Sequence, residues 1–174
     1  MRKPRHLSAW VGIVANYKVV GLESENAYRK TDVLLNLYRQ INWCLCEKIE
    51  ELNQITYESC FGDHETLSYL LNFAPDKELE IFRSMAINAM NTKVLLKLLN
   101  QAIKKVKEYP ENGKLYYSVL DLTYISQEKY SESEILTKLN LERSTYFRRK
   151  KEAIYLLGYI LFGQVMPDFI DGKH

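Results

Sequence analysis

The densest concentration of charge in the sequence is a short basic segment over residues 143–151. Its basic residues, with no acidic residue among them, are Arg143, Arg148, Arg149, Lys150 and Lys151. Guanidinium and ammonium groups bind phosphates, and arginine also forms paired hydrogen bonds with guanine in the major groove. A basic run on a helix is commonly only a solvated face, so the surrounding elements must decide whether the segment favours recognition of DNA.

Helical spacing divides this segment into an outward face and its flanks. Steps of one, three, one and three residues place five side chains on the outward face: Arg143, Ser144, Phe147, Arg148 and Lys151. This face is expected to read base edges. Arg149 and Lys150 flank it and are expected to contact phosphates. Thr145, in the first turn, completes the candidate DNA-binding set.

The elements that must present this face are two helices joined by a tight turn. Ser131 and Glu134 form a capping box that predicts a short helix ending near Leu139. A turn at Asn140 and Leu141 then leads into a longer helix over 142–162. A small core is expected to hold the pair together, formed by Ile135, Leu136, Leu139, Leu141, Tyr146 and Ala153. Capping box, turn and basic helix in this order indicate a helix-turn-helix that binds double-stranded DNA.

The rest of the chain is predicted to be helical as well. Apolar residues at three- and four-residue steps predict the following: a long helix over 25–54, a break at Cys60–Asp63, a helix from about His64 to Pro75, and one or two helices over 76–108 interrupted near Asn91. The Pro and Asn-Gly of residues 109–113 predict a turn before a short helix over 115–125. The expected fold is all-α, with a helical body (1–108) and a C-terminal helix-turn-helix module (109–174).

A family resemblance is visible in the same region. Residues 130–154 resemble region 4 of sigma factors, and a wider set is similar to the ArpU- and RinA-like phage regulators: Pro110, Gly113, Tyr117, Tyr124, Ser144–Arg148, Lys151–Ile154 and Phe162-Gly163. The resemblance implies a transcriptional regulator of phage or prophage late genes. Glu142 departs from the pattern, because related modules often place serine at this helix start, where a hydroxyl caps free N–H groups.

Composition sets limits on the other function classes. The net charge of +2 names no partner by itself, and the catalytic motifs of enzymes are missing, so neither an enzyme nor a cofactor is expected. Three cysteines, an odd number, suit the reducing cytoplasm. Cys44, Cys46, Cys60 and His64 are interpreted as thiols and a lone histidine rather than a metal site. No apolar run is expected to reach the length that spans a membrane.

The segment over 153–162 is apolar on nearly every side, so something must cover it. Packing against residues 115–125 and the helical body is favoured over a homodimer interface. An alternative function is a helical adaptor that binds another protein through this segment. A DNA-binding regulator of this kind would act either by contacting RNA polymerase or by occluding a promoter.

Overall fold

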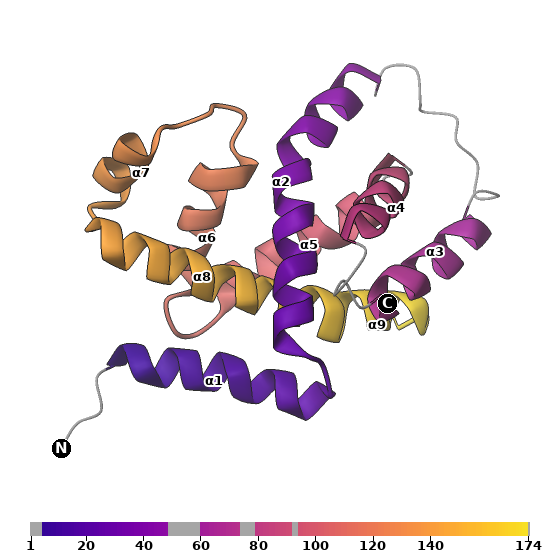
Figure 1. Ribbon diagram of the computed structural model, residues 1–174, viewed down its shortest axis with the longest axis horizontal. Helices are drawn as coiled ribbons and strands as arrows, with labels where there is room; N and C mark the ends of the chain where they lie inside the picture. Colours follow the sequence, from indigo (N-terminus) through magenta and orange to yellow (C-terminus); the bar gives the residue numbers. More distant parts are fainter. Residues whose placement is uncertain (1–4, 49–59, 74–78, 92–93, 174) are drawn as a thin grey trace.

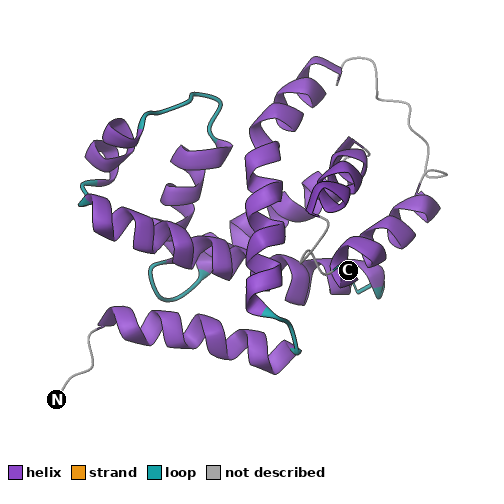
Figure 2. Ribbon diagram, viewed as in Figure 1, coloured by secondary structure: helices purple, strands orange, loops and turns teal. Residues whose placement is uncertain are grey.

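The computed structural model of the protein describes residues 5–48, 60–73, 79–91 and 94–173. These residues form helices joined by turns, and no strand occurs among them (Figure 2). The helices are α1 (Arg5–Val20), α2 (Ser24–Lys48), α3 (Cys60–Asn72), α4 (Leu79–Asn91), α5 (Val94–Glu108), α6 (Gly113–Leu120), α7 (Glu132–Leu139), α8 (Arg143–Ile160) and α9 (Met166–Ile170), with π-helical turns η2 (Asp121–Ile125) and η3 (Leu161–Val165). The predicted all-α fold is confirmed.

Helix α8 lies at the centre of the molecule. Helix α2 crosses it, α1 lies along it, and α5 and α6 pack against it (Figure 1). The crossing is close at Gly158, where a Cβ atom would lie 2.7 Å from Tyr17 Oη and 2.8 Å from Thr31 Oγ1. Helix α8 continues through Gly158, although a glycine within a helix can break it. Gly158 provides the space in which α1 and α2 approach.

The C-terminal half of α8 belongs to the main hydrophobic core. Ile154, Leu156 and Leu157 are buried with side chains from α1, α2, α5 and α6. The apolar segment over 153–162 is thus covered by the helical body and α6. Ala153 also lies in this main core, so its expected place in the small helix-turn-helix core is corrected.

Hydropathy alone would allow part of the chain to cross a membrane. Residues 143–170 form a helical stretch that is long and apolar enough by length and composition, contrary to the sequence-based expectation. Within its most apolar window, 61% of the residues are buried inside the protein. Such burial is typical of the core helix of a globular protein.

Several predicted boundaries can be compared with the structure. Helix α4 ends at Asn91, where an interruption was expected, and the turn over 110–112 includes Asn112 in the left-handed region at φ 61°. The prediction of a break at Cys60–Asp63 was wrong, because α3 begins at Cys60 and continues through Gly62. One glycine costs a helix only about 1 kcal/mol, which burial of Leu67 and Leu70 offsets. Residues 49–54 of the expected long helix lie outside the described residues, as do the side chains of Cys44, Cys46, Cys60 and His64.

Candidate nucleic-acid interface

Helix α7 and the turn after it are fixed by local hydrogen bonds. The Ser131 backbone N–H donates to Glu134 Oε2 at 2.7 Å, and the Glu134 N–H donates to Ser131 Oγ at 3.4 Å, so the predicted capping box is present. The hydrogen bonds from Ser131 hold the pKa of Glu134 below its usual value. At the other end, Asn140 adopts the left-handed conformation with φ 50°, which suits a helix end. The turn to α8 then takes only residues 140–142.

A small second core joins α7 and the start of α8 to α6. Its buried members are Val119, Ile135 and Tyr146, one from each helix. Partly buried side chains packed around them are Leu115, Leu122, Tyr130, Leu136, Leu139 and Leu141. The sequence predicted the contributions of α7, the turn and Tyr146. It did not reveal that Val119 and Leu115 of α6 supply the third side.

The first turns of α8 carry an exposed face that matches the sequence-based prediction. Its members, which we call the reading face, are Arg143, Ser144, Phe147, Arg148 and Lys151, all of which are exposed. Between them, Tyr146 is buried, Thr145 is half-buried, and no acidic residue interrupts the face. The guanidinium of Arg143 lies 5.7 Å from the Phe147 ring and forms an ion pair of 2.6 Å with Glu132 at the start of α7.

Arg149 differs from its expected role. Its Nη1 lies 2.8 Å from Glu152 Oε2, and the two side chains are only 14% and 4% exposed. Tyr116 Oη donates to the same carboxylate oxygen at 2.8 Å. Burial opposes the charge on Arg149, but the hydrogen bond and charge of Glu152 outweigh it, so the pKa of Arg149 is raised. This arginine joins α8 to α6 inside the protein, and we withdraw its assignment as a phosphate contact.

The two lysines of the segment, Lys150 on the flank and Lys151 in the reading face, lie over aromatic rings. Lys150 is half-buried, with Nζ 5.2 Å from the centre of the Tyr124 ring, and Lys151 Nζ lies 5.9 Å from that of Tyr155. Cation–π contacts at exposed sites contribute only about 0.5–1 kcal/mol, so phosphate oxygens can compete for these lysines.

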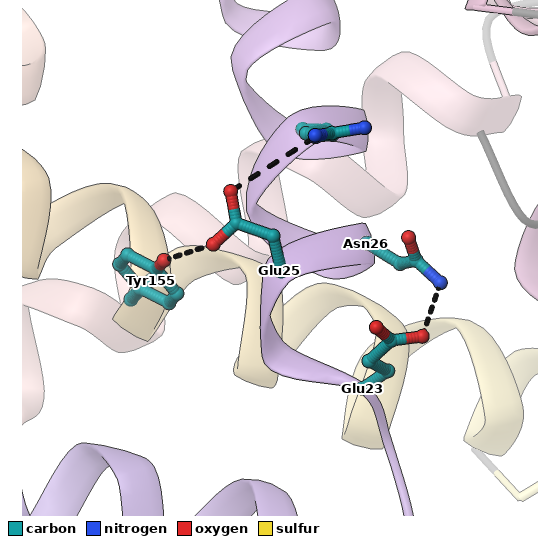
Figure 3. A network of polar contacts seen from close by, with 5 residues as sticks. Glu23, Glu25, Asn26 and Tyr155 are labelled. Atoms are coloured by element: carbon teal, nitrogen blue, oxygen red, sulfur yellow. Dashed lines mark hydrogen bonds and ion pairs between the residues drawn. The ribbon is translucent and has the colours of Figure 1, made fainter. Parts of the chain in front are cut away.

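Beyond the reading face, α8 is anchored to α2. Tyr155 Oη donates to Glu25 Oε2 at 2.6 Å, and Glu25 also lies 3.9 Å from Arg29 (Figure 3). The Tyr155 ring packs edge-on against Trp10 of α1, with centroids 5.0 Å apart. Burial, together with the charge of Glu25, raises the pKa of Tyr155. The second half of α8 is therefore held between α1 and α2.

Comparison with known proteins places this chain in a family. A family model described as "Protein of unknown function (DUF1492)" matches residues 70–158, a little over half of the sequence. The chain belongs to this family. The matched region contains α4 to α7 and α8 as far as Gly158, so it includes the capping box, the turn and the reading face. No curated protein and no solved structure gives a significant match.

Proposed function

We propose that this protein is a sequence-specific regulator of transcription that binds double-stranded DNA through the reading face of α8. The observation that carries the proposal is the division of α8 into two halves. Its first two turns expose basic and hydroxyl side chains on one side, while its second half is buried. Residues 143–151 extend over about 12 Å of helix, which is similar to the width of the major groove.

The residue types on the reading face support direct contacts with bases. Arg143 and Arg148 carry planar guanidinium groups suited to guanine, and Ser144 and the neighbouring Thr145 carry hydroxyls that donate or accept. Phe147, which is 43% exposed, offers an apolar contact to a thymine methyl group. Lys151 belongs to the reading face, Lys150 is assigned to phosphates, and Arg149 is left out because it pairs with Glu152.

The same features favour DNA over the adaptor alternative. A protein-binding adaptor would need the apolar segment of α8 at its surface, but Ile154, Leu156 and Leu157 are buried. The resemblance to sigma region 4 and to ArpU- and RinA-like regulators further supports DNA and suggests late-gene control in a phage or prophage. We propose that the protein works in the cytoplasm. Contact with RNA polymerase and homodimerisation stay predictions from sequence.

A salt titration of DNA binding tests this proposal. The full chain should bind duplex DNA with an affinity that falls steeply with salt, because bound lysines and arginines release counterions from the phosphates. The Arg148→Ala variant should bind more weakly. Its control is Arg83→Ala, which removes the same charge from an exposed position on α4. Equal affinities for the two variants, or no salt-dependent binding at all, would refute the proposal.

A further inference from the structure

We infer that Arg39, on α2, is a positioning residue that sets the orientation of the reading face relative to the helical body. The inference rests on the proposed function, because it gives α2 a part in DNA recognition without contact to DNA. It concerns a residue 104 positions before the start of α8, outside the region matched by the family model.

Arg39 caps the helical segment that leads into α7. Its Nε donates to the backbone carbonyl of Ser126 at 2.8 Å, and its Nη2 donates to that of Thr123 at 3.2 Å. These carbonyls lie at the end of η2, where a helix has no internal donors left for its last oxygens. The planar guanidinium reaches the two oxygens from two different nitrogens held in a fixed geometry, which the single ammonium nitrogen of a lysine does not reproduce.

Thr123 carries this contact onward to α8. Its hydroxyl lies 3.1 Å from Tyr146 Oη, and the Tyr146 ring packs against that of Phe147 with centroids 5.1 Å apart. Tyr146 is buried in the small core, whereas Phe147 belongs to the reading face. One residue of η2 thus touches the helical body through its carbonyl and the first turn of α8 through its side chain.

A second contact runs beside the first. Tyr124 Oη donates to Asp32 of α2 at 3.5 Å, and Lys150 lies over the Tyr124 ring. Asp32 and Arg39, about two turns apart on α2, therefore both contact η2. Each contact lies next to a residue of the basic segment of α8, Lys150 for Asp32 and Tyr146 for Arg39. Because base contacts depend on placing side chains to within a fraction of an ångström, release of η2 should weaken base recognition more than phosphate binding.

Arg39 also lines an open groove of about 820 Å³ between α2 and the loop after η2, together with Gln40, Asn42 and Lys129. It could therefore contact a phosphate directly instead of acting through Thr123. The two roles differ in their salt dependence. A lost phosphate contact lowers the salt slope by about one and weakens all sequences alike. A lost positioning contact leaves the slope unchanged and weakens the preferred sequence most.

The test compares Arg39→Met, Arg39→Lys and the exposed control Arg83→Met by DNA binding well below their unfolding temperatures. Arg39→Met should lose about threefold to thirtyfold affinity for the preferred sequence, the range for residues that couple distant sites, with the wild-type salt slope and non-specific affinity. Arg39→Lys should recover part of the loss, and Arg83→Met should match the wild type. Wild-type affinity in Arg39→Met, or an equal loss on all sequences with a lower slope, would overturn the inference.

Amide hydrogen exchange of the free protein provides a readout that needs no DNA. Arg39→Met should speed exchange over residues 126–146 and leave α5 unchanged. Unchanged exchange over 126–146, or acceleration spread evenly over all helices, would contradict positioning. If the wild type bound no DNA sequence specifically, the proposed function would fail, and the exchange measurement would still decide whether Arg39 holds the segment.

Discussion

Two arginines of the reading face differ in their neighbours. Arg143 forms an ion pair of 2.6 Å with Glu132, at side-chain exposures of 71% and 41%. An exposed pair of this kind contributes at most about 1 kcal/mol, but Arg143 must still weaken it to bind DNA. Arg148 lies one turn later and is exposed. Arg148 is therefore the better candidate for pairing with guanine.

Replacement of Arg148 by lysine separates shape from charge. The substitution keeps the positive charge but removes the planar fork that pairs with guanine O6 and N7. We expect Arg148→Lys to lose about 1–3 kcal/mol on the preferred sequence and to flatten the preference at one base position. Arg143→Lys should lose less. Competition binding against single-base variants of the site measures both effects, and an unchanged preference in Arg148→Lys would argue for a phosphate contact.

Arg149 should matter for stability rather than for DNA binding. The almost fully buried carboxylate of Glu152 is bound by Arg149 and Tyr116, and removal of the Arg149 guanidinium leaves it with the Tyr116 hydrogen bond. Loss of one partner from a buried ion pair costs about 3–5 kcal/mol. Urea unfolding of Arg149→Ala should show this loss. Lys150→Ala is the matched comparison and should instead lower the salt slope by about one with little change in stability.

At the level of single residues, spacing predicted the exposed positions well and the partners poorly. One helical period was enough to place Arg143, Ser144, Phe147, Arg148 and Lys151 outward. The i,i+3 spacing of Arg149 and Glu152 was a local signal for their ion pair. Tyr116 and Arg39 gave no such signal, because their contacts join segments far apart in the sequence.

Helix α8 begins without a side-chain cap. Glu142 occupies the N-cap position in an extended conformation, but its carboxylate accepts no hydrogen bond from the first-turn N–H groups. Aspartate is among the preferred N-cap residues, and it keeps the negative charge that favours a helix start. A residue at position 142 that caps the first-turn N–H groups should therefore stabilise the start of α8.

The substitution Glu142→Asp tests this weakness. It should raise the free energy of unfolding by about 0.5–1 kcal/mol, because the shorter side chain can accept from the N–H groups of the first turn. Thermal unfolding measures the gain, which corresponds to a rise of about 1–4 °C for a chain of this size. Glu142→Gln, which keeps the length, should give no gain. A decrease in both variants would mean that the glutamate already stabilises the helix start.

Elements with strong local signals were predicted correctly, and those that depend on packing were not. The capping box of α7 and the turn at residues 110–112 follow from residue types with fixed conformational preferences. The start of α3 does not, because Gly62 and Asp63 would suit a break equally well. The anchoring of η2 by α2 required the assembled fold.

In the whole molecule, α8 serves two structural roles. Its first half forms the candidate interface with the small core, and its second half lies in the main core with α1, α2 and α5. The predicted boundary between a body (1–108) and a module (109–174) stays a prediction. Since α8 supplies part of the main core, experiments on DNA binding should use the full chain.

Buried tyrosines should make the fold sensitive to alkaline pH. Burial raises the pKa of Tyr17, Tyr116, Tyr124 and Tyr155 above the ordinary value of about 10. Above that pH the unfolded chain loses these protons and the folded protein keeps them, so the free energy of unfolding falls. Burial lowers the pKa of Lys30 to about 8, which has the opposite sign and raises stability between about pH 8 and 10.4.

Urea unfolding from pH 7 to 11 measures this balance. Stability should rise from about pH 8, be greatest near pH 10, and then fall by about 1.4 kcal/mol per pH unit for each buried tyrosine. Tyr124→Phe removes one ionising group while losing only the long contact of 3.5 Å to Asp32. Above pH 10, the unfolding free energy of this variant should fall less steeply than that of the wild type, by the contribution of one tyrosine. A flat profile above pH 10 would show that the tyrosines ionise freely in the folded protein.

The central claim is that the reading face of α8 recognises a DNA sequence. Selection from a random library of duplex DNA by the full chain tests it most directly, in parallel with a variant carrying Arg143→Ala, Phe147→Ala and Arg148→Ala. These positions are exposed, so the variant should stay folded. The wild type should enrich one motif, and the variant should bind DNA without that preference. Failure of the wild type to enrich any sequence, or enrichment of the same motif by the variant, would contradict the account.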